Sequence, residues 1–454
     1  MRKWWGGKRR KSHYVVIFVT FFLMSSPSAG DSVLSEYAFL DSIVIEDDVS
    51  TPFESSSIDD WQFSIEQNNT GDTDESSRQF FSLSKYQLFA KDDSFALGLE
   101  TNAFDDQHAI NWAYDSSSIG KALGALWIIQ WTGTYSVNHL EDESTSESVT
   151  DLSWDSGVYV SSYWADDNKT LDESWFLQWG IGARWQVVDI GVDQFFEDGS
   201  RSQFLLPGLK VRWQQSTHYS QSEGYFAYEL NMKGAAKTEN VLRHGTECAG
   251  FFTVENDGCI ERLDSVSDLD IGEDFQLLSA GLQFGVGLGR QGYDASRHRA
   301  VVNVRGQYSF GERLLPHFQY SLGGLYSIRG YEEQLVAGDD ALELTLEYRY
   351  SPLVAQWAQE IDGWLIVFYD WGKWQTNPQS LTISTADYSA QRRVERNGSS
   401  GILRSWGAGV EFSLWKRSPY NVHLTLIWGK ALEDDGVEVS AGESRLHGYV
   451  RVAF

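Results

Sequence analysis

The end of the chain alternates between apolar and polar residues, and this constrains the fold more than any other feature. From Arg445 to Phe454 the even positions carry Leu, Gly, Val, Val and Phe, and the odd positions carry Arg, His, Tyr, Arg and Ala. A period of two is typical of a β-strand with one apolar and one polar face. A last strand that stops on an aromatic residue suits a closed membrane barrel, with that ring at the membrane interface. The alternative is a soluble β-protein that ends in Phe.

The first 29 residues have the composition of a secretory signal peptide. Six basic residues precede a short apolar run over 15–24, and small residues at 25–29 offer a cleavage site after Ala29. The apolar run is about half of the ~20 residues that a spanning helix needs. An exported chain without a spanning helix can cross a membrane only as a barrel. The sequence predicts a signal peptide over 1–29, a periplasmic lead-in over 30–56 and an outer-membrane barrel over 57–454.

The composition agrees with a barrel and excludes one class of partner. The chain has 19 Trp, 21 Tyr and 25 Phe residues. Its mean hydropathy of -0.35 is too low for a helical membrane protein, but it suits strands that are apolar outside and polar inside. The formal charge of -28 excludes nucleic acid as a partner. We attribute the acidity to solubilising loops.

The two cysteines, Cys248 and Cys259, lie close together in a stretch that contains Gly, Asp and Asn. In an exported protein such a pair predicts a disulfide within a loop. A metal site is not expected, since only two thiols and one nearby histidine, His244, are available. We predict neither a metal nor a cofactor.

Sixteen segments have the patterning of strands, an even number within the range of single-chain outer-membrane barrels. They cover 59–67, 79–90, 94–104, 107–114, 122–136, 149–163, 173–189, 202–216, 224–237, 274–289, 298–311, 341–352, 363–374, 402–415, 421–431 and 444–454. If the N-terminus is periplasmic, short turns such as 91–93 fall on the periplasmic side and long loops such as 238–273, 312–340 and 375–401 fall outside. A sandwich would not sort its connections in this way, so the pattern favours a barrel.

The alternation within strands also indicates which side chains face the lumen. Over 341–350, leucines and tyrosines occupy one face, while Glu343 and Glu347 share the other. Asp370 lies on the face opposite Tyr369 and Trp371, so it points inward if those rings face lipid. The sequence therefore predicts a polar, charged lumen.

One loop, 321–340, is long, punctuated by glycine and not strand-like in its middle, which is typical of a functional loop. Arg329-Gly330-Tyr331 places a permanent cation and an aromatic ring beside a residue that allows close backbone approach. A buried Arg329 would need a counter-charge, and Asp370 could supply it as a charge-assisted pair. The alternative is that Arg329 is an ordinary exposed loop residue.

Several motifs resemble one family of outer-membrane proteins. Ile328-Arg329-Gly330-Tyr331 matches a (V/I)-R-G-(F/Y) motif, and Phe368-Tyr369-Asp370-Trp371-Gly372 matches F-x-D-x-G. Together with Gly306-Gln307, 318–324, Gly338-Asp339 and 346–348, these residues resemble the two-partner-secretion transporters of Gram-negative bacteria. This is the haemolysin-activator (ShlB/FhaC/HecB, TpsB) family of the BamA-like barrel superfamily. The resemblance implies a loop that folds into the lumen, where Arg329 pairs with Asp370 on the thirteenth strand, near Glu347. It also implies that Phe454 is an assembly signal.

The resemblance implies transport, or insertion, of a polypeptide at the outer membrane. Expected partners are membrane lipid, a secreted exoprotein or nascent outer-membrane protein, and the barrel-assembly machinery. The family carries periplasmic POTRA domains, and the short segment before the predicted barrel suggests a barrel-only member. The alternative is a passive pore or structural barrel without a secreted partner. Catalysis is not expected, because G-x-S-x-G, H-E-x-x-H and P-loop motifs are absent.

Overall fold

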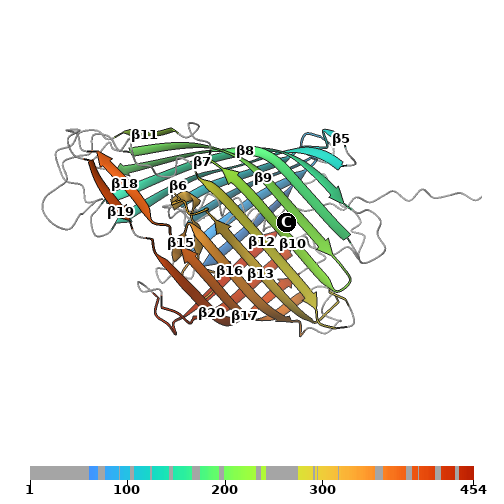
Figure 1. The fold of residues 1–454 in the computed structure, drawn as a ribbon. Helices are drawn as coiled ribbons and strands as arrows, with labels where there is room; N and C mark the ends of the chain where they lie inside the picture. The colour runs from blue at the N-terminus through green and yellow to red at the C-terminus, as the bar shows by residue number, and fades with distance from the viewer. Residues whose placement is uncertain are drawn as a thin grey trace, which may run out of the picture.

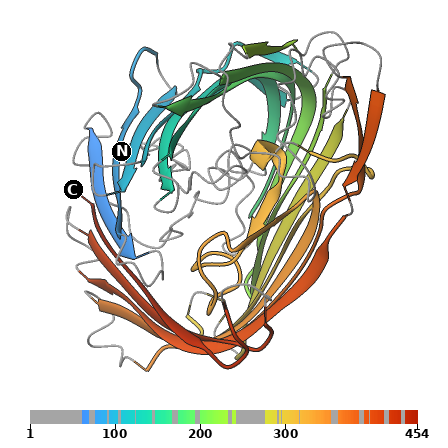
Figure 2. The same ribbon diagram turned by 90° about the vertical axis from the view of Figure 1, so that its left-hand side faces the viewer.

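Antiparallel strands hydrogen-bond to their neighbours around a ring in the computed structural model of the chain (Figures 1 and 2). The structure describes residues 61–69, 77–90, 93–102, 107–122, 125–142, 147–165, 174–193, 199–231, 237–241, 275–289, 292–293, 295–314, 316–352, 361–384, 391–396, 398–414, 421–434 and 439–453. The predicted signal peptide, the lead-in, Cys248, Cys259 and Phe454 lie outside these residues, so what the sequence indicates about them stays a prediction.

Sixteen strands form the wall, and each overlaps one of the strands predicted from alternation. They are β1 (Gln62–Asn69), β2 (Ser77–Tyr86), β3 (Ser94–Asn102), β4 (Gln107–Asp115), β6 (Ala125–Asp142), β7 (Glu147–Ala165), β8 (Ser174–Asp193), β9 (Gly199–Ser216), β10 (Ser220–Leu230), β12 (Gln276–Gly287), β13 (His298–Tyr308), β16 (Asp340–Tyr350), β17 (Ile361–Gln375), β20 (Ser400–Leu414), β21 (Asn421–Ala431) and β22 (Ser444–Ala453).

The ring is closed by pairing of the first strand with the last. β1 pairs with β22 over five residue pairs, from Ser64–Ala453 to Asn68–Tyr449. In Figure 2 the blue first strand and the red last strand lie side by side. The predicted all-β antiparallel barrel of sixteen strands is therefore confirmed.

The two faces of the wall differ as the alternation predicts. Outward side chains are apolar and exposed, for example Leu346 on β16, Val367 on β17 and Leu426 on β21. Inward side chains on the same strands include Glu343 and Asp370, which are buried. Aromatic clusters lie on the outer face, as in the T-shaped Trp406–Trp428 pair with ring centroids 5.4 Å apart. This is the arrangement that lipid outside and a polar lumen inside require.

The long connections are more structured than the sequence suggests. The loop after β13 contains the 3-10 turn η1 (Pro316–Phe318) and a small sheet of β14 (Tyr320–Leu322) and β15 (Val336–Gly338). The connection after β17 contains a hairpin of β18 (Gln379–Ser384) and β19 (Gln391–Arg396). Two short strands, β5 (Gly120–Ala122) and β11 (Lys237–Val241), extend the sheet. The middle of 321–340, between β14 and β15, contains no named strand, as the sequence predicts.

Among the described residues, no helix is both long and apolar enough to cross a membrane.

Candidate functional site

The site is built from the segment 309–339, which leaves the wall after β13 and returns to it at β16 (Figure 2). Asp339 closes the base of this lumenal loop. Its carboxylate accepts hydrogen bonds from the backbone N of Leu314 at 3.0 Å, from Gln319 Nε2 at 2.8 Å and from the backbone N of Asn377 at 2.5 Å. Burial raises the pKa of Asp339, while these hydrogen bonds oppose the rise. The loop therefore starts from a fixed base.

Arg329 at the tip of the loop is buried and held by two carboxylates. Its Nε and Nη2 donate to Oδ2 and Oδ1 of Asp370 at 2.9 and 2.7 Å, and its backbone N donates to the same Oδ2 at 3.0 Å. Nη1 donates to Oε1 of Glu347 at 2.5 Å. Ser405 Oγ adds a longer contact to Asp370 at 3.4 Å. This is the bidentate geometry in which the planar guanidinium is strongest.

The motif on β17 shapes the wall under this arginine. The guanidinium carbon of Arg329 lies 3.6 Å from the ring centroid of Phe368, a cation–π contact. Asp370 follows two residues later on the same face. Gly372 leaves the room in which Ile328 packs, since a Cβ there would meet Ile328 Cδ1 at 3.0 Å. Phe368 thus supplies a ring and Asp370 a counter-charge for Arg329, and Gly372 leaves space for Ile328.

At Gly330 and Tyr331 the tip of the loop packs closely against β21 and β20. Gly330 has a φ of +97°, and a Cβ on it would lie 2.9 Å from the backbone N of Lys430. Tyr331 is fully buried, and its hydroxyl donates to the carbonyls of Arg404 and Glu433, both at 3.0 Å. A glycine is required here because the backbones of loop and wall touch.

The charges around Arg329 continue along the wall toward the opposite end of the barrel. Glu347 Oε2 accepts from Arg349 Nε at 2.8 Å, and Arg349 Nη1 lies 3.4 Å from Glu411 Oε2. Burial disfavours the charge on Arg329, but Asp370 and Glu347 outweigh it and raise its pKa. The tip of the loop is thus one member of an alternating chain of charges.

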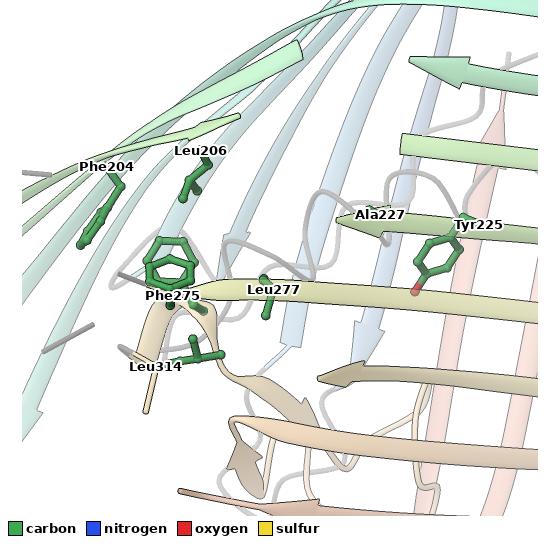
Figure 3. Packing of buried hydrophobic residues seen from close by; sticks show 8 residues of the cluster. Phe204, Leu206, Tyr225, Ala227, Phe275, Leu277 and Leu314 are labelled. Atoms are coloured by element: carbon green, nitrogen blue, oxygen red, sulfur yellow. The ribbon is translucent and has the colours of Figure 1, made fainter. Parts of the chain in front are cut away.

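A second contact holds the start of the loop to the wall on the other side of β13, at β9 and the start of β12. Phe318 is fully buried, with its ring centroid 5.2 Å from that of Phe204 and 4.7 Å from that of Phe275. Figure 3 shows Phe275 beside Leu277, and Phe204 and Leu206 on β9, in this apolar cluster. Behind it, Arg184 on β8 pairs with Glu229 on β10 at 2.7 Å, and the Arg184 guanidinium lies 6.0 Å from the Phe318 ring. The loop is therefore anchored at two places.

The loop also reaches the strands that close the barrel. Three polar contacts join it to β1, β2 and β22, namely Tyr326 Oη to Glu66 at 3.3 Å, Glu333 to Arg78 at 3.2 Å, and Glu332 to Arg445. On β13 and β16, Arg305 and Glu343 pair at 2.5 Å, and each also contacts the loop, at the carbonyl of Tyr326 and at Ser327 Oγ. The loop thus spans the lumen from wall to wall.

The structure brings together most of the residues that the sequence selected. Arg329, Gly330, Tyr331, Asp370, Glu347, Phe368 and Gly372 lie in one cluster. The second anchor was missed as a site, although Phe318 stands in the stretch that matched the family. Arg184 and Glu229 lie on lumen-facing positions, but nothing in the sequence pairs them with each other or with the loop.

Comparison with known proteins identifies the type of barrel. Residues 267–391 match the family model of the haemolysin secretion/activation proteins ShlB/FhaC/HecB. This range contains the lumenal loop and the β17 motif. The resemblance to the ShlB/FhaC/HecB family is confirmed. The outer-membrane location predicted with it is confirmed as well.

Solved structures share the fold at low sequence identity. CdiB from Escherichia coli aligns with a TM-score of 0.57 and 14% identity over 87% of this chain and 63% of that one. CdiB from Acinetobacter baumannii aligns with a TM-score of 0.52 and 12% identity over 87% of this chain and 60% of that one. The chain thus spans less than two thirds of either CdiB chain. No curated protein matches it.

Among the residues that the structure describes, no group of three or more His, Cys, Asp or Glu side chains is placed to hold a metal ion.

Proposed function

We propose that this ShlB/FhaC/HecB-like barrel translocates a polypeptide across the outer membrane, with the loop 309–339 as a latch inside the lumen. The observation that carries the proposal is the buried, bidentate pair of Arg329 and Asp370. A passive pore would gain nothing from a cation and two carboxylates fixed across its own lumen.

The two anchors suit a plug that moves while the wall stays intact. The wall is held by backbone hydrogen bonds between strands, and the loop by side-chain contacts to that wall. Breaking the ion pairs therefore leaves the barrel closed. Once the loop has left the wall, water in the polar lumen can take the place of the partners that Arg329, Asp370 and Glu347 lose.

The partner that fits is an unfolded secreted exoprotein, the cargo class of the matched family. An extended chain presents polar backbone groups along its length, and a lumen lined by alternating charges can accept them transiently. Insertion of a nascent outer-membrane protein at the β1–β22 junction is the alternative route for the same type of barrel. The chain's own assembly would use the barrel-assembly machinery.

The experiment compares the proteins secreted by cells with and without this chain. The culture medium is analysed by mass spectrometry from deletion cells carrying the wild-type chain, Arg329→Lys or the outward-facing control Leu346→Ala. We expect one large exoprotein, encoded beside this gene, to be present with the wild type and the control and strongly reduced with Arg329→Lys. An unchanged medium after deletion, together with a steadily open pore in planar bilayers, would favour the passive pore instead.

A further inference from the structure

Three basic side chains form a row on the outer face of the barrel, at one rim. Lys373 on β17, Arg404 on β20 and Lys430 on β21 all point away from the lumen, because their neighbours Gly372, Leu403 and Gly429 face inward and are buried. Lys373 and Arg404 are exposed, and Lys430 is partly exposed. The row lies outside the cluster that holds the loop.

The register places the three bases beside one another. Lys373 pairs with Ile402 and Arg404 with Trp371, so the two bases are diagonal neighbours on adjacent strands. Lys430 pairs with Trp406, two residues from Arg404, which makes it the next diagonal neighbour. Diagonal neighbours on one face lie about 7–8 Å apart at their backbones, within reach of one another's long side chains. The row therefore presents its charges to one region of solvent or lipid.

Each base has a tryptophan two residues away on the same face of its strand. Trp371, Trp406 and Trp428 precede or follow the bases by two residues on the same three strands, so they share the outer face and lie one step deeper toward the middle of the wall. Tryptophan rings gather at the level of lipid headgroups, with apolar chains on one side and water on the other. The bases one step outward are thus at the level of headgroup phosphates.

The rim that carries the row is the extracellular one. The long connections 309–339 and 376–399 lie at this end, whereas 217–219 and 415–420, at the other end, are short connections. Short periplasmic turns and long extracellular loops are the rule for such barrels. The leaflet at this rim is the outer one, whose glycolipid carries phosphate groups on its sugars.

The row is basic although the whole chain is acidic, with 64 acidic and 36 basic residues. Among the described residues, Glu433 pairs with Arg404, and neither Lys373 nor Lys430 takes part in an ion pair. We propose that Lys373, Arg404 and Lys430 bind the phosphates of the outer-leaflet glycolipid. Bases near an anionic membrane surface each strengthen such binding, and tryptophan rings position the sugar and the upper acyl chain.

Arg404 belongs to the proposed lipid site through its side chain and contacts the lumenal cluster through its backbone. The hydroxyl of Tyr331 bonds to the carbonyls of Arg404 and Glu433 from inside, while the side chains of those residues pair outside. For this reason the test leaves Arg404 unchanged and alters the two lysines only.

The experiment titrates the full-length barrel in detergent with purified diphosphorylated lipid A and counts bound lipid by native mass spectrometry. The variants are Lys373→Gln/Lys430→Gln and the charge-preserving Lys373→Arg/Lys430→Arg. The control is Lys85→Gln, because Lys85 is an outward-facing base beside a tryptophan at the opposite rim, 5.1 Å from the Trp61 ring centroid. Folding of each variant is first checked by its heat-modifiable migration in gels.

We expect the glutamine pair to weaken lipid A binding by about tenfold or more, and the arginine pair and Lys85→Gln to bind like the wild type. Lipid A stripped of its phosphates should bind no better to the wild type than to the glutamine pair. Equal binding of lipid A by the wild type and the glutamine pair would overturn the proposal. So would phosphatidylglycerol or phosphate-free lipid A binding as tightly as lipid A. If the glutamine pair does not fold, the single variants are compared in the same way.

Discussion

At the scale of the residue, the Arg329–Asp370 pair is held by three hydrogen bonds. Arg329→Ala leaves the Asp370 carboxylate buried without its partner, which should cost on the order of 3–5 kcal/mol. Asp370→Ala should cost less, because Arg329 keeps Glu347. The double variant should be little worse than Arg329→Ala, since both remove the same contact. Urea unfolding in detergent, followed by tryptophan fluorescence, measures all three. Additive losses would contradict a direct pair.

Gly330 offers a test of how closely the loop approaches the wall. Gly330 and Gly311 both have positive φ, +97° and +88°, so an alanine strains the backbone similarly at each. Only at Gly330 would the new Cβ meet the wall, at 2.9 Å from Lys430 N, whereas at Gly311 nothing lies within 4 Å. Gly330→Ala should therefore destabilise the folded barrel by more than the ~1–2 kcal/mol of backbone strain, and Gly311→Ala by no more than that. Equal melting temperatures of the two variants would refute the close contact.

At the scale of the element, the loop depends on its second anchor as well as its first. Phe318→Ala removes a fully buried ring from the Phe204–Phe275 cluster, which should cost about 3–5 kcal/mol of loop attachment. The control Phe284→Ala alters a ring of equal size on the lipid-facing surface. Limited proteolysis from the outer surface should cleave 309–339 faster in Phe318→Ala than in the control. Equal cleavage rates would mean that the Arg329 cluster holds the loop alone.

The same anchor should weaken in acid. His317 is buried beside Phe318, and burial lowers its pKa from 6.5 to about 4. The attached state therefore holds a neutral imidazole, and a detached loop takes up a proton below pH 6.5. Attachment should be fully present above pH 6.5 and should weaken progressively between pH 6.5 and 4. Proteolysis of the loop with an acid-tolerant protease measures this, and His317→Gln should remove that part of the pH dependence. A pH profile unchanged by His317→Gln would contradict it.

How far the sequence predicts the structure differs between wall and loop. Strict alternation, as in 341–350, fixes both the strand and its lumen face, which is why the inward positions of Glu343, Glu347 and Asp370 follow from the sequence alone. The loop sequence shows no regular alternation of apolar and polar residues. Its two short strands contact β16 and β17. Between them, Ile328 and Tyr331 share a buried cluster with Leu403 of β20 and Ala431 of β21. Contacts of this kind join residues far apart in the chain, so local patterns do not reveal them.

At the scale of the whole molecule, the barrel closes through a short junction, and the loop touches both of its sides. β1 and β22 share five residue pairs. Glu66 on β1 and Arg445 on β22 both contact the loop from inside. A change in the loop can therefore also affect the β1–β22 junction. To distinguish transport through the lumen from opening of the junction, the junction itself must be locked.

A disulfide between Gln67 and Val450 provides that lock. The two residues are paired across the junction and face outward, and paired antiparallel residues have Cα atoms about 4.5–5.5 Å apart, which suits a disulfide. Gln67→Cys/Val450→Cys, built with Cys248→Ser and Cys259→Ser, should cross-link on oxidation. Gln67→Cys/Val452→Cys should not, since Val452 pairs with Ile65. If the exoprotein passes through the lumen, the locked barrel should secrete it at the rate of its reduced form, measured as exoprotein released per minute. Secretion that stops on oxidation and returns on reduction would place the route at the junction, and the lumenal loop would then act as a brace for β1 and β22.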